Sequence, residues 1–269
     1  MESQKELVKD FWNEASCGEN LYMKGEDARA QFDNQLKIRY ELEPYITSFA
    51  EFDMHKGEKV LEVGVGLGAD HQMFAQNGAL TFGVDLTERA IEQTKKRFAL
   101  LDLKSTLLVA DAENLPFGKN EFDMVYSWGV IHHSPNTPQA ISEIHRVLKK
   151  GGNARIMIYY KYSMIGLMLW VRYGLFNLKP FTSLKELYAR YLESPGTKAY
   201  SIREAQELFK AFDEVQIETV LTHGDLLSSG AGQRHKGILL NIARKIYPRF
   251  IIRNLFSKNG LFMLIRLTK

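Results

Sequence analysis

The sequence predicts an α/β fold, with a doubly wound sheet of parallel strands and helices on both faces. Between residues 59 and 159, short β-prone apolar runs alternate with helical patterns. The first run leads straight into glycines at alternate positions, Gly64, Gly66 and Gly68, which is typical of a buried strand that turns sharply into a helix. Because such alternation supplies a crossover helix for each strand, it favours a parallel sheet.

The first 55 residues are predicted to form an N-terminal helical cap on a larger domain of residues 56–269. Apolar residues recur at helical spacing in two stretches of this cap. They are Leu7, Val8, Phe11 and Trp12 in the first stretch and Ile38, Leu42, Ile46 and Phe49 in the second. The polar loop between the stretches, residues 13–25, holds Tyr22, which we expect to cover a bound substrate.

Five strands and three connecting helices are expected in the first part of the larger domain. The strands lie near residues 59–63, 80–84, 105–109, 122–127 and 153–159. The helices lie near residues 69–77, 87–100 and 137–149. A loop at residues 111–121 joins the third strand to the fourth, and residues 150–152 stop the last helix before the fifth strand.

Two insertions interrupt this alternation, at residues 160–200 and 222–259. The first holds two aromatic-rich helical segments, at residues 162–176 and 183–192, and is predicted to form a helical lid. The second holds a basic apolar helix at about 235–247. Ser201 begins a helix between the insertions, with Glu204 in a capping pattern. Two further strands are expected at residues 215–221 and 261–267.

The composition is that of an ordinary globular protein, with 45% hydrophobic and 25% charged residues in a chain of 269. The single cysteine, Cys17, excludes an intrachain disulfide and a zinc site built from cysteines. The first ten residues lack the basic-then-apolar pattern of a signal peptide. The apolar run at 162–171 is half the length of a membrane-crossing helix, which needs about 20 residues. We therefore expect a cytoplasmic protein.

Charge is distributed unevenly along the chain. Nine lysines and arginines and no acidic residue follow Asp225. This asymmetry predicts an anionic partner, either a phosphorylated substrate or an anionic membrane surface that the protein contacts peripherally. The alternative is a solvated basic helix together with a sheet edge guarded by charge.

The glycine turn predicts a nucleotide-like ligand but leaves its identity open. Gly64, Gly66 and Ala69 have the spacing of dinucleotide-binding folds, and Asp85 follows about 20 residues later, so an NAD(P)-dependent oxidoreductase is the rival interpretation. Three features argue for a different ligand. Glu62 stands inside the first strand, where a buried carboxylate needs a partner. Asp111 follows the third strand, and the fourth strand runs into a histidine pair.

Together these residues closely resemble the class I S-adenosylmethionine-dependent methyltransferases, in particular the small-molecule branch that includes enzymes of ubiquinone and menaquinone biosynthesis. The resemblance covers roughly residues 57–160. It implies a Rossmann-like sheet of seven strands in the order 3-2-1-4-5-7-6, with the last strand antiparallel. It also implies S-adenosyl-L-methionine as the methyl donor and S-adenosyl-L-homocysteine as the product.

The resemblance implies a role for each cofactor-binding residue. Glu62 and the turn of Gly64, Gly66 and Gly68 meet the amine and carboxylate of the methionine part, and Ser127 lies beside it. The ribose and adenine are contacted by the ends of the second and third strands. There Asp85 accepts from the ribose hydroxyls, Leu86 packs on the adenine, and Asp111 and Ala112 read its edge.

The acceptor is predicted to be a small molecule, anionic or aromatic in character, with oxygen slightly favoured over nitrogen or carbon. Methyl transfer from a sulfonium depends mainly on positioning, so a base is optional. His132 and His133 follow the fourth strand, and either could take a proton from the acceptor. Further candidates for substrate contact are Tyr160 in the lid and His223, Asp225, Arg234 and His235 in the second insertion.

Other interpretations remain at this point. The histidines and aspartate of the second insertion match no metal motif, so no metal is expected. Nucleic acid is not expected either, since the chain lacks the Asn-Pro-Pro-aromatic motif and the catalytic Pro-Cys pair of nucleic-acid methyltransferases. The alternatives are a peripheral membrane enzyme that methylates a lipid or lipid-linked glycan, and a non-catalytic cofactor-binding protein.

Overall fold

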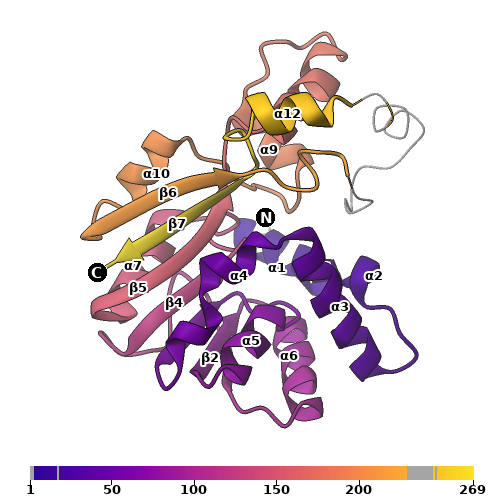
Figure 1. Ribbon diagram of the computed structural model, residues 1–269. Coiled ribbons are helices and arrows are strands. Elements are labelled where there is room, and N and C mark those ends of the chain that lie inside the picture. The colour runs from indigo at the N-terminus through magenta and orange to yellow at the C-terminus, as the bar shows by residue number, and fades with distance from the viewer. Residues whose placement is uncertain (1–2, 17, 229–244, 246) are drawn as a thin grey trace.

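A seven-stranded sheet forms the centre of the computed structural model, which describes residues 3–16, 18–228, 245 and 247–269 (Figure 1). The strand order is β3-β2-β1-β4-β5-β7-β6. The first five strands run parallel, whereas β7 is antiparallel to both of its neighbours. The predicted order and the antiparallel last strand are confirmed. The bounds are β1 Lys59–Val63, β2 Leu80–Asp85, β3 Thr106–Val109, β4 Phe122–Trp128, β5 Leu148–Tyr159, β6 Glu214–Val220 and β7 Phe262–Thr268.

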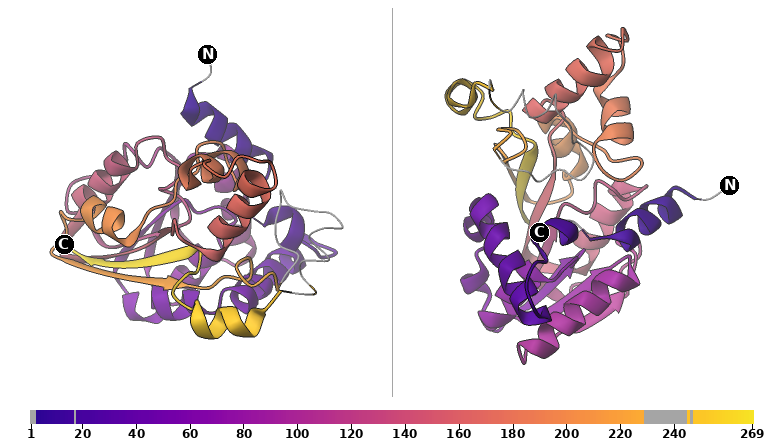
Figure 2. Two further views of the ribbon diagram at one scale, coloured as in Figure 1. Left: turned by 90° about the horizontal axis from the view of Figure 1, so that it is seen from above. Right: turned by 90° about the vertical axis from the view of Figure 1, so that its right-hand side faces the viewer.

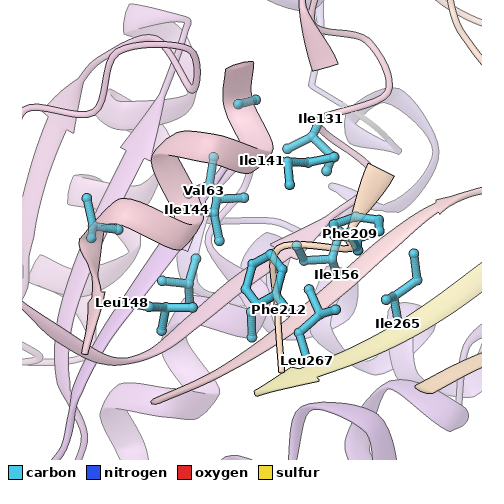
Figure 3. Packing of buried hydrophobic residues seen from close by; sticks show 14 of the residues in the cluster. Val63, Ile131, Ile141, Ile144, Leu148, Ile156, Phe209, Phe212, Ile265 and Leu267 are labelled. Carbon is cyan, nitrogen blue, oxygen red and sulfur yellow. The ribbon is translucent and has the colours of Figure 1, made fainter. Parts of the chain in front are cut away.

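One face of the sheet is covered by α7 (Thr137–Val147) and α10 (Ile202–Leu208). Their apolar side chains, among them Ile141, Ile144 and Ala205, pack with the inward faces of β4, β5 and β7 (Figure 3). All three side chains are almost completely buried. This layer fixes the carboxyl end of β4, where the histidine pair follows.

The other face of the sheet is covered by the end of the N-terminal cap and by α5 (Ala69–Gln76). Ile46 and Phe49 of α4 (Tyr45–Ala50) pack with Phe74 and with the β1 residue Val60. The remaining helices of the first 100 residues are α1 Gln4–Glu14, α2 Glu19–Tyr22, α3 Ala28–Leu42, the 3-10 helix η1 Phe52–His55 and α6 Glu88–Leu100. The cap therefore shares its core with the sheet, and the domain boundary at residue 55 stays a prediction.

The fifth strand begins earlier than predicted, at Leu148 instead of 153, because the chain leaves α7 directly into the sheet. Leu148 pairs with Phe122, and the register then shifts before Met124 pairs with Asn153. The residues expected to stop the helix thus form an irregular stretch within β5. Gly151 in this stretch has a φ of +74°, which explains the glycine there.

The lid and α12 (Arg249–Leu255) rise from the same end of the molecule (Figures 1 and 2). The helix predicted over 162–176 is divided into α8 (Met164–Leu169) and the π-helical η2 (Trp170–Leu175), and α9 (Leu184–Tyr191) follows. The helix predicted over 235–247 falls almost entirely outside the described residues. In the parts of the chain that the structure describes, no helix combines the length and apolar character needed to cross a bilayer.

Candidate functional site

The turn between β1 and α5 leaves an open surface beside its backbone. Gly64 and Gly66 have φ angles of +88° and +52°, which side chains disfavour. A Cβ on Gly64 would lie 2.1 Å from the Val130 side chain, whereas one on Gly66 would meet nothing within 4 Å. Close packing therefore requires the first glycine, and the second leaves its backbone accessible to a ligand.

Asp85, at the end of β2, has its carboxylate held beside this turn. Its Oδ2 accepts from the Gly66 N–H at 3.1 Å. Its Oδ1 accepts from the Thr87 N–H at 3.0 Å and from the Thr87 hydroxyl at 2.8 Å. Burial raises the pKa of Asp85, although these hydrogen bonds act in the opposite direction. The Asp85 carboxylate is therefore a fixed hydrogen-bond acceptor at the carboxyl end of β2.

A pocket opens where the parallel strands end. It has an empty volume of about 910 Å³, part of which is open to solvent, and this is within the usual size of a cofactor site. Among the predicted site residues, those that line it are Gly64, Gly66, Asp85, Leu86, Asp111, Ala112 and His133. The structure therefore brings together residues from the ends of four strands and the glycine turn.

Helix α1 forms a wall of this pocket. Val8 and Trp12 line it, and the Lys5 ammonium lies 2.5 Å from Asp111 Oδ2 and 2.6 Å from Glu113 Oε2. The sequence predicted the apolar face of α1 but not its place over the pocket. Its apolar spacing carries no information on which surface it covers.

Three predicted cofactor residues lie next to the pocket without lining it. Glu62 is buried, and its Oε2 is 3.0 Å from His71 Nδ1. Burial, and then the nearby Asp70 charge, raise the pKa of Glu62 well above its usual range, while burial lowers the pKa of His71 to about 3. The buried Ser127 hydroxyl donates to the Val63 carbonyl at 3.1 Å, and Gly68 begins α5. Their cofactor contacts remain predictions.

The two histidines have different environments. His132 is completely buried with its ring 4.0 Å from that of Tyr159, and neither ring nitrogen has a hydrogen-bond partner among the described residues. Burial, reinforced by the neighbouring His133 and Lys198, lowers the pKa of His132 well below its usual range. His133 instead lines the pocket, where its ring packs edge-on against Trp12. Of the two histidines, only His133 lines the pocket.

The end of the lid contacts His133 through Glu193, Ser194 and Thr197. We call this segment, residues 193–200, the lid return. His133 Nδ1 lies 2.8 Å from the Ser194 hydroxyl and 3.1 Å from that of Thr197. Its Nε2 lies 3.4 Å from Glu193 Oε2, which accepts from the Tyr159 hydroxyl at 2.6 Å. The sequence analysis missed Glu193, because no local pattern links it to a histidine 60 residues earlier.

His132, His133 and Glu193 also form a group that could hold a metal ion, with ligand atoms within 4.8 Å of one another. Around tetrahedral zinc, with bonds near 2 Å, ligand atoms lie roughly 3.4 Å apart. Hydrogen bonds within the protein hold Glu193 and His133 in this arrangement.

The predicted substrate residues that the structure describes do not line the pocket. Asp225 is buried and accepts from the backbone N–H groups of Thr222, Ile165 and Leu261, so its carboxylate joins the lid to β7. Tyr160 packs on the core beneath the lid. His223 is partly buried near Asp225, and Tyr22 belongs to α2. Arg234 and His235 lie outside the described residues.

A comparison with known protein families finds a match for the strands and the glycine turn in the central part of the chain. Residues 61–156 match the model of a family described as a methyltransferase domain. The central part of this chain is a methyltransferase domain. The matched region includes the glycine turn, Asp85, Asp111 and the histidine pair, and all of the predicted cofactor residues lie within it.

Curated relatives support the same assignment of the methyltransferase domain. The chain is 38% identical over 98 residues to an uncharacterized methyltransferase of Synechocystis, covering 36% of this chain and 44% of that protein. It is 27% identical over 167 residues to the ubiquinone biosynthesis O-methyltransferase of Coxiella burnetii, covering 60% and 64%. It is 31% identical over 132 residues to phosphoethanolamine N-methyltransferase 2 of Caenorhabditis elegans, covering 48% and 28%. The chain thus spans less than two thirds of each relative.

Solved structures share the fold over most of this chain. A complex of the Haloferax volcanii Trm112 activator with a methyltransferase matches with a TM-score of 0.58 and 18% identity, over 90% of this chain and 97% of that one. The Haemonchus contortus phosphoethanolamine N-methyltransferase 2, bound to phosphomonomethylethanolamine and S-adenosylhomocysteine, matches with a TM-score of 0.56 and 17% identity, over 91% and 60%. At these identities, the likeness is one of fold.

Proposed function

We propose that this protein transfers the methyl group of S-adenosylmethionine to a small-molecule acceptor, with oxygen favoured over nitrogen or carbon. The observation that carries the proposal is the Asp85 carboxylate, held by Gly66 and Thr87 at the pocket mouth. An acceptor pair fixed in this way fits the two hydroxyls of a ribose. The methyltransferase relatives support the same reaction.

The other pocket residues fit the remaining parts of that cofactor. Leu86 and Ala112 offer apolar contacts to an adenine, and the Asp111 carboxylate offers an acceptor for its amine. The accessible backbone at Gly66 leaves room for the methionine part. When bound, the sulfonium supplies an electrophilic methyl group whose leaving group is already activated, so holding the acceptor in line provides most of the acceleration.

His133 is the residue that we expect to accept a proton from a hydroxyl acceptor. It lines the pocket, and histidine is the side chain that ordinarily changes protonation near neutral pH. Glu193, 3.4 Å behind it, would stabilise the imidazolium that forms, while Ser194 and Thr197 fix the ring. His132 stays neutral in its apolar surroundings and positions its neighbour.

Titration calorimetry with S-adenosylmethionine, S-adenosylhomocysteine and NADH tests the cofactor. We expect heat with the first two ligands and none with NADH. Asp85→Ala should abolish binding, whereas Asp53→Ala, which removes an exposed carboxylate elsewhere on the cap, should leave it unchanged. Binding of NADH without binding of either methyl-donor nucleotide would sink the proposal and favour an oxidoreductase.

The acceptor is identified by incubating the protein with a labelled methyl donor and a fractionated lysate of the source cell. A labelled water-soluble product supports the small-molecule proposal. An intact donor after long incubation with every fraction would favour a non-catalytic cofactor-binding protein instead.

A second candidate is methylation of a lipid or lipid-linked glycan by the same site at a membrane. The observation that favours it is the exposure of large apolar side chains on the lid and on α12, among them Phe181 and Phe250. Label that partitions into organic solvent after the same incubation would select this candidate over a water-soluble acceptor.

A further inference from the structure

Two separate segments present apolar side chains to solvent at the same end of the molecule. They are residues 162–181 and α12, and we call them together the lid face. Phe181 is 99% exposed, Leu178 90% and Phe250 80%. Among the described residues, five of the six large apolar side chains that are more than two-thirds exposed lie on this face. Apolar groups concentrated in this way mark an interaction surface.

The lid face is held in place by specific contacts. The Met164 N–H donates to the Asn259 carbonyl at 2.9 Å, and the Asn259 side chain donates to the Tyr162 carbonyl at 3.1 Å. The Trp170 indole donates to the Pro180 carbonyl at 2.9 Å, which ties the loop before Phe181 to η2. Both segments project away from the body of the sheet (Figures 1 and 2). The exposed side chains are therefore presented on an ordered surface.

An apolar cavity lies between the first of these segments and the residues that follow α12. Its empty volume is about 780 Å³, including space open to solvent. Its walls come from α8, η2, the start of α9 and the residues after α12. They are Tyr162, Ser163, Met164, Leu167, Trp170, Leu184, Phe256 and Asn259. The cavity is separate from the cofactor pocket, with which it shares no lining residue.

The charge of the lid face and its surroundings is almost entirely positive. Within residues 162–192 and 247–261 the one acidic residue is Glu186, which pairs with Arg190 at 3.1 Å. The other basic residues of these ranges are Arg172, Lys179, Lys185, Arg249, Arg253 and Lys258. Apolar side chains beside cationic ones match the interface of an anionic lipid layer, with its acyl chains below and its phosphates above.

We propose that the lid face docks on a bilayer that contains anionic lipid, and that the cavity lined by α8, η2 and the residues after α12 takes an apolar chain from that layer. Phe181, Leu178 and Phe250 would enter the interface, with Lys179 and Arg253 at the level of the phosphates. Docking rests on surfaces outside the cofactor pocket, so it can be tested apart from cofactor binding.

Vesicle flotation tests the docking. We expect the full chain to float with mixed phosphatidylcholine/phosphatidylglycerol vesicles at low salt, to float weakly with phosphatidylcholine alone, and to be released by salt. Phe181→Ser with Phe250→Ser should lower partitioning about a hundredfold, since each buried ring contributes roughly tenfold. Met54→Ser, which removes an apolar side chain 71% exposed elsewhere, is the matched control.

Charge is tested in the same assay. Lys179→Gln with Arg253→Gln should weaken partitioning roughly fivefold per charge. Lys95→Gln with Lys96→Gln, two exposed lysines of α6, should have no such effect. Calorimetry with S-adenosylhomocysteine on each variant checks that the domain is folded, so that loss of docking and loss of the cofactor site are distinguished.

Tryptophan fluorescence tests the cavity. Trp170 lines it, whereas Trp12 and Trp128 line the cofactor pocket. We expect lipids with brominated acyl chains to quench the wild type, and the quenching to be lost in Trp170→Phe. Quenching that persists in this variant would overturn the cavity assignment. Absence of flotation at low salt, equal loss in Met54→Ser, or a stable dimer that Phe181→Ser with Phe250→Ser dissociates would overturn docking.

Discussion

At the scale of single residues, the imidazole of His133 obtains its position from side chains 60 or more residues later in the chain. Ser194 and Thr197 fix its Nδ1, and Glu193 faces its Nε2. The sequence indicated the histidine pair because it directly follows a strand. It could not indicate that one ring would be buried against Tyr159 and the other left at the pocket, because burial depends on how the lid packs.

Glu193→Gln should lower the rate of methyl transfer by about tenfold to a hundredfold while leaving cofactor affinity unchanged. In the proposed mechanism, Glu193 stabilises the protonated form of His133, and it does not line the cofactor pocket. Transfer of labelled methyl to the acceptor fraction measures the rate, and calorimetry measures the affinity. Glu186→Gln, on the outer face of α9, is the control. Equal rates for Glu193→Gln and wild type would remove Glu193 from the proposed mechanism.

Cofactor affinity should depend on pH through Asp85. Its ionised carboxylate is the form that accepts from ribose hydroxyls, and burial raises the pKa of Asp85. Affinity is therefore complete above that raised pKa and falls, by up to about tenfold per pH unit, as the pH drops through it. The loss begins at a higher pH than an ordinary aspartate, near 3.9, would give. Calorimetry across the acidic range measures this.

Asp85→Asn is the control for that pH series. Its affinity for the cofactor should be weaker than that of the wild type and should no longer depend on pH in this range. A wild-type dissociation constant that stays flat down to about pH 4 would contradict the role of the carboxylate.

The environment of Glu62 shows what the sequence alone could not predict about a buried carboxylate, namely which side chain is its partner. A carboxylate inside a buried strand does need a partner, as the sequence indicated. The structure supplies that partner from α5, where His71 faces Glu62 across the turn. Which of several polar neighbours a buried group selects depends on packing distances that spacing along the chain does not determine.

At the scale of secondary structure elements, α1 is a helix of the N-terminal cap that forms a wall of the pocket. It is held by the Lys5 ion pairs and by a capping box between Ser3 and Glu6, and its Trp12 faces the pocket. S-adenosylhomocysteine should therefore slow amide hydrogen exchange in α1. The amides of α10, which contributes no residue to the pocket, should be unaffected.

Exchange measured by mass spectrometry with and without the ligand checks this. Unchanged exchange in α1 at saturating ligand would show that the helix is not part of the binding wall.

The strands were the elements most fully predictable from sequence. A buried parallel strand is a continuous apolar run, and each of the seven falls within a few residues of its predicted place. The start of β5 was wrong because glycines that usually end a helix here form an irregular stretch of strand. The division of the lid into α8 and η2 was not predicted, since apolar spacing does not distinguish an α-helix from a π-helical turn.

At the scale of the whole molecule, the N-terminal cap and the sheet should unfold as one unit. Ile46 and Phe49 of the cap are completely buried in the core on one face of the sheet. Arg39 of α3 also binds Asp70 of α5 through two hydrogen bonds, of 2.8 and 2.6 Å. Calorimetry should therefore show a single cooperative transition rather than one transition for each predicted domain.

Arg39→Met should lower the free energy of unfolding by about 3 kcal/mol, because it leaves the buried Asp70 carboxylate without its cation. The transition should move to lower temperature without splitting. Arg29→Met removes an exposed pair with Asp33 and should cost less than about 1 kcal/mol. Two resolved transitions, with only the first sensitive to Arg39→Met, would indicate an independently folding cap.

The lid return has a consequence for exchanging the lid between related proteins. Besides holding His133, it places the Lys198 ammonium 2.9 Å from the Pro135 carbonyl and the Tyr200 hydroxyl 3.0 Å from that of Thr137. The lid return and the loop after β4 thus hold each other through specific hydrogen bonds. Exchanging one of them for a relative's segment without the other would lose these contacts. A chimera that borrows a relative's lid to change its acceptor should carry the relative's counterpart of residues 132–137 with it.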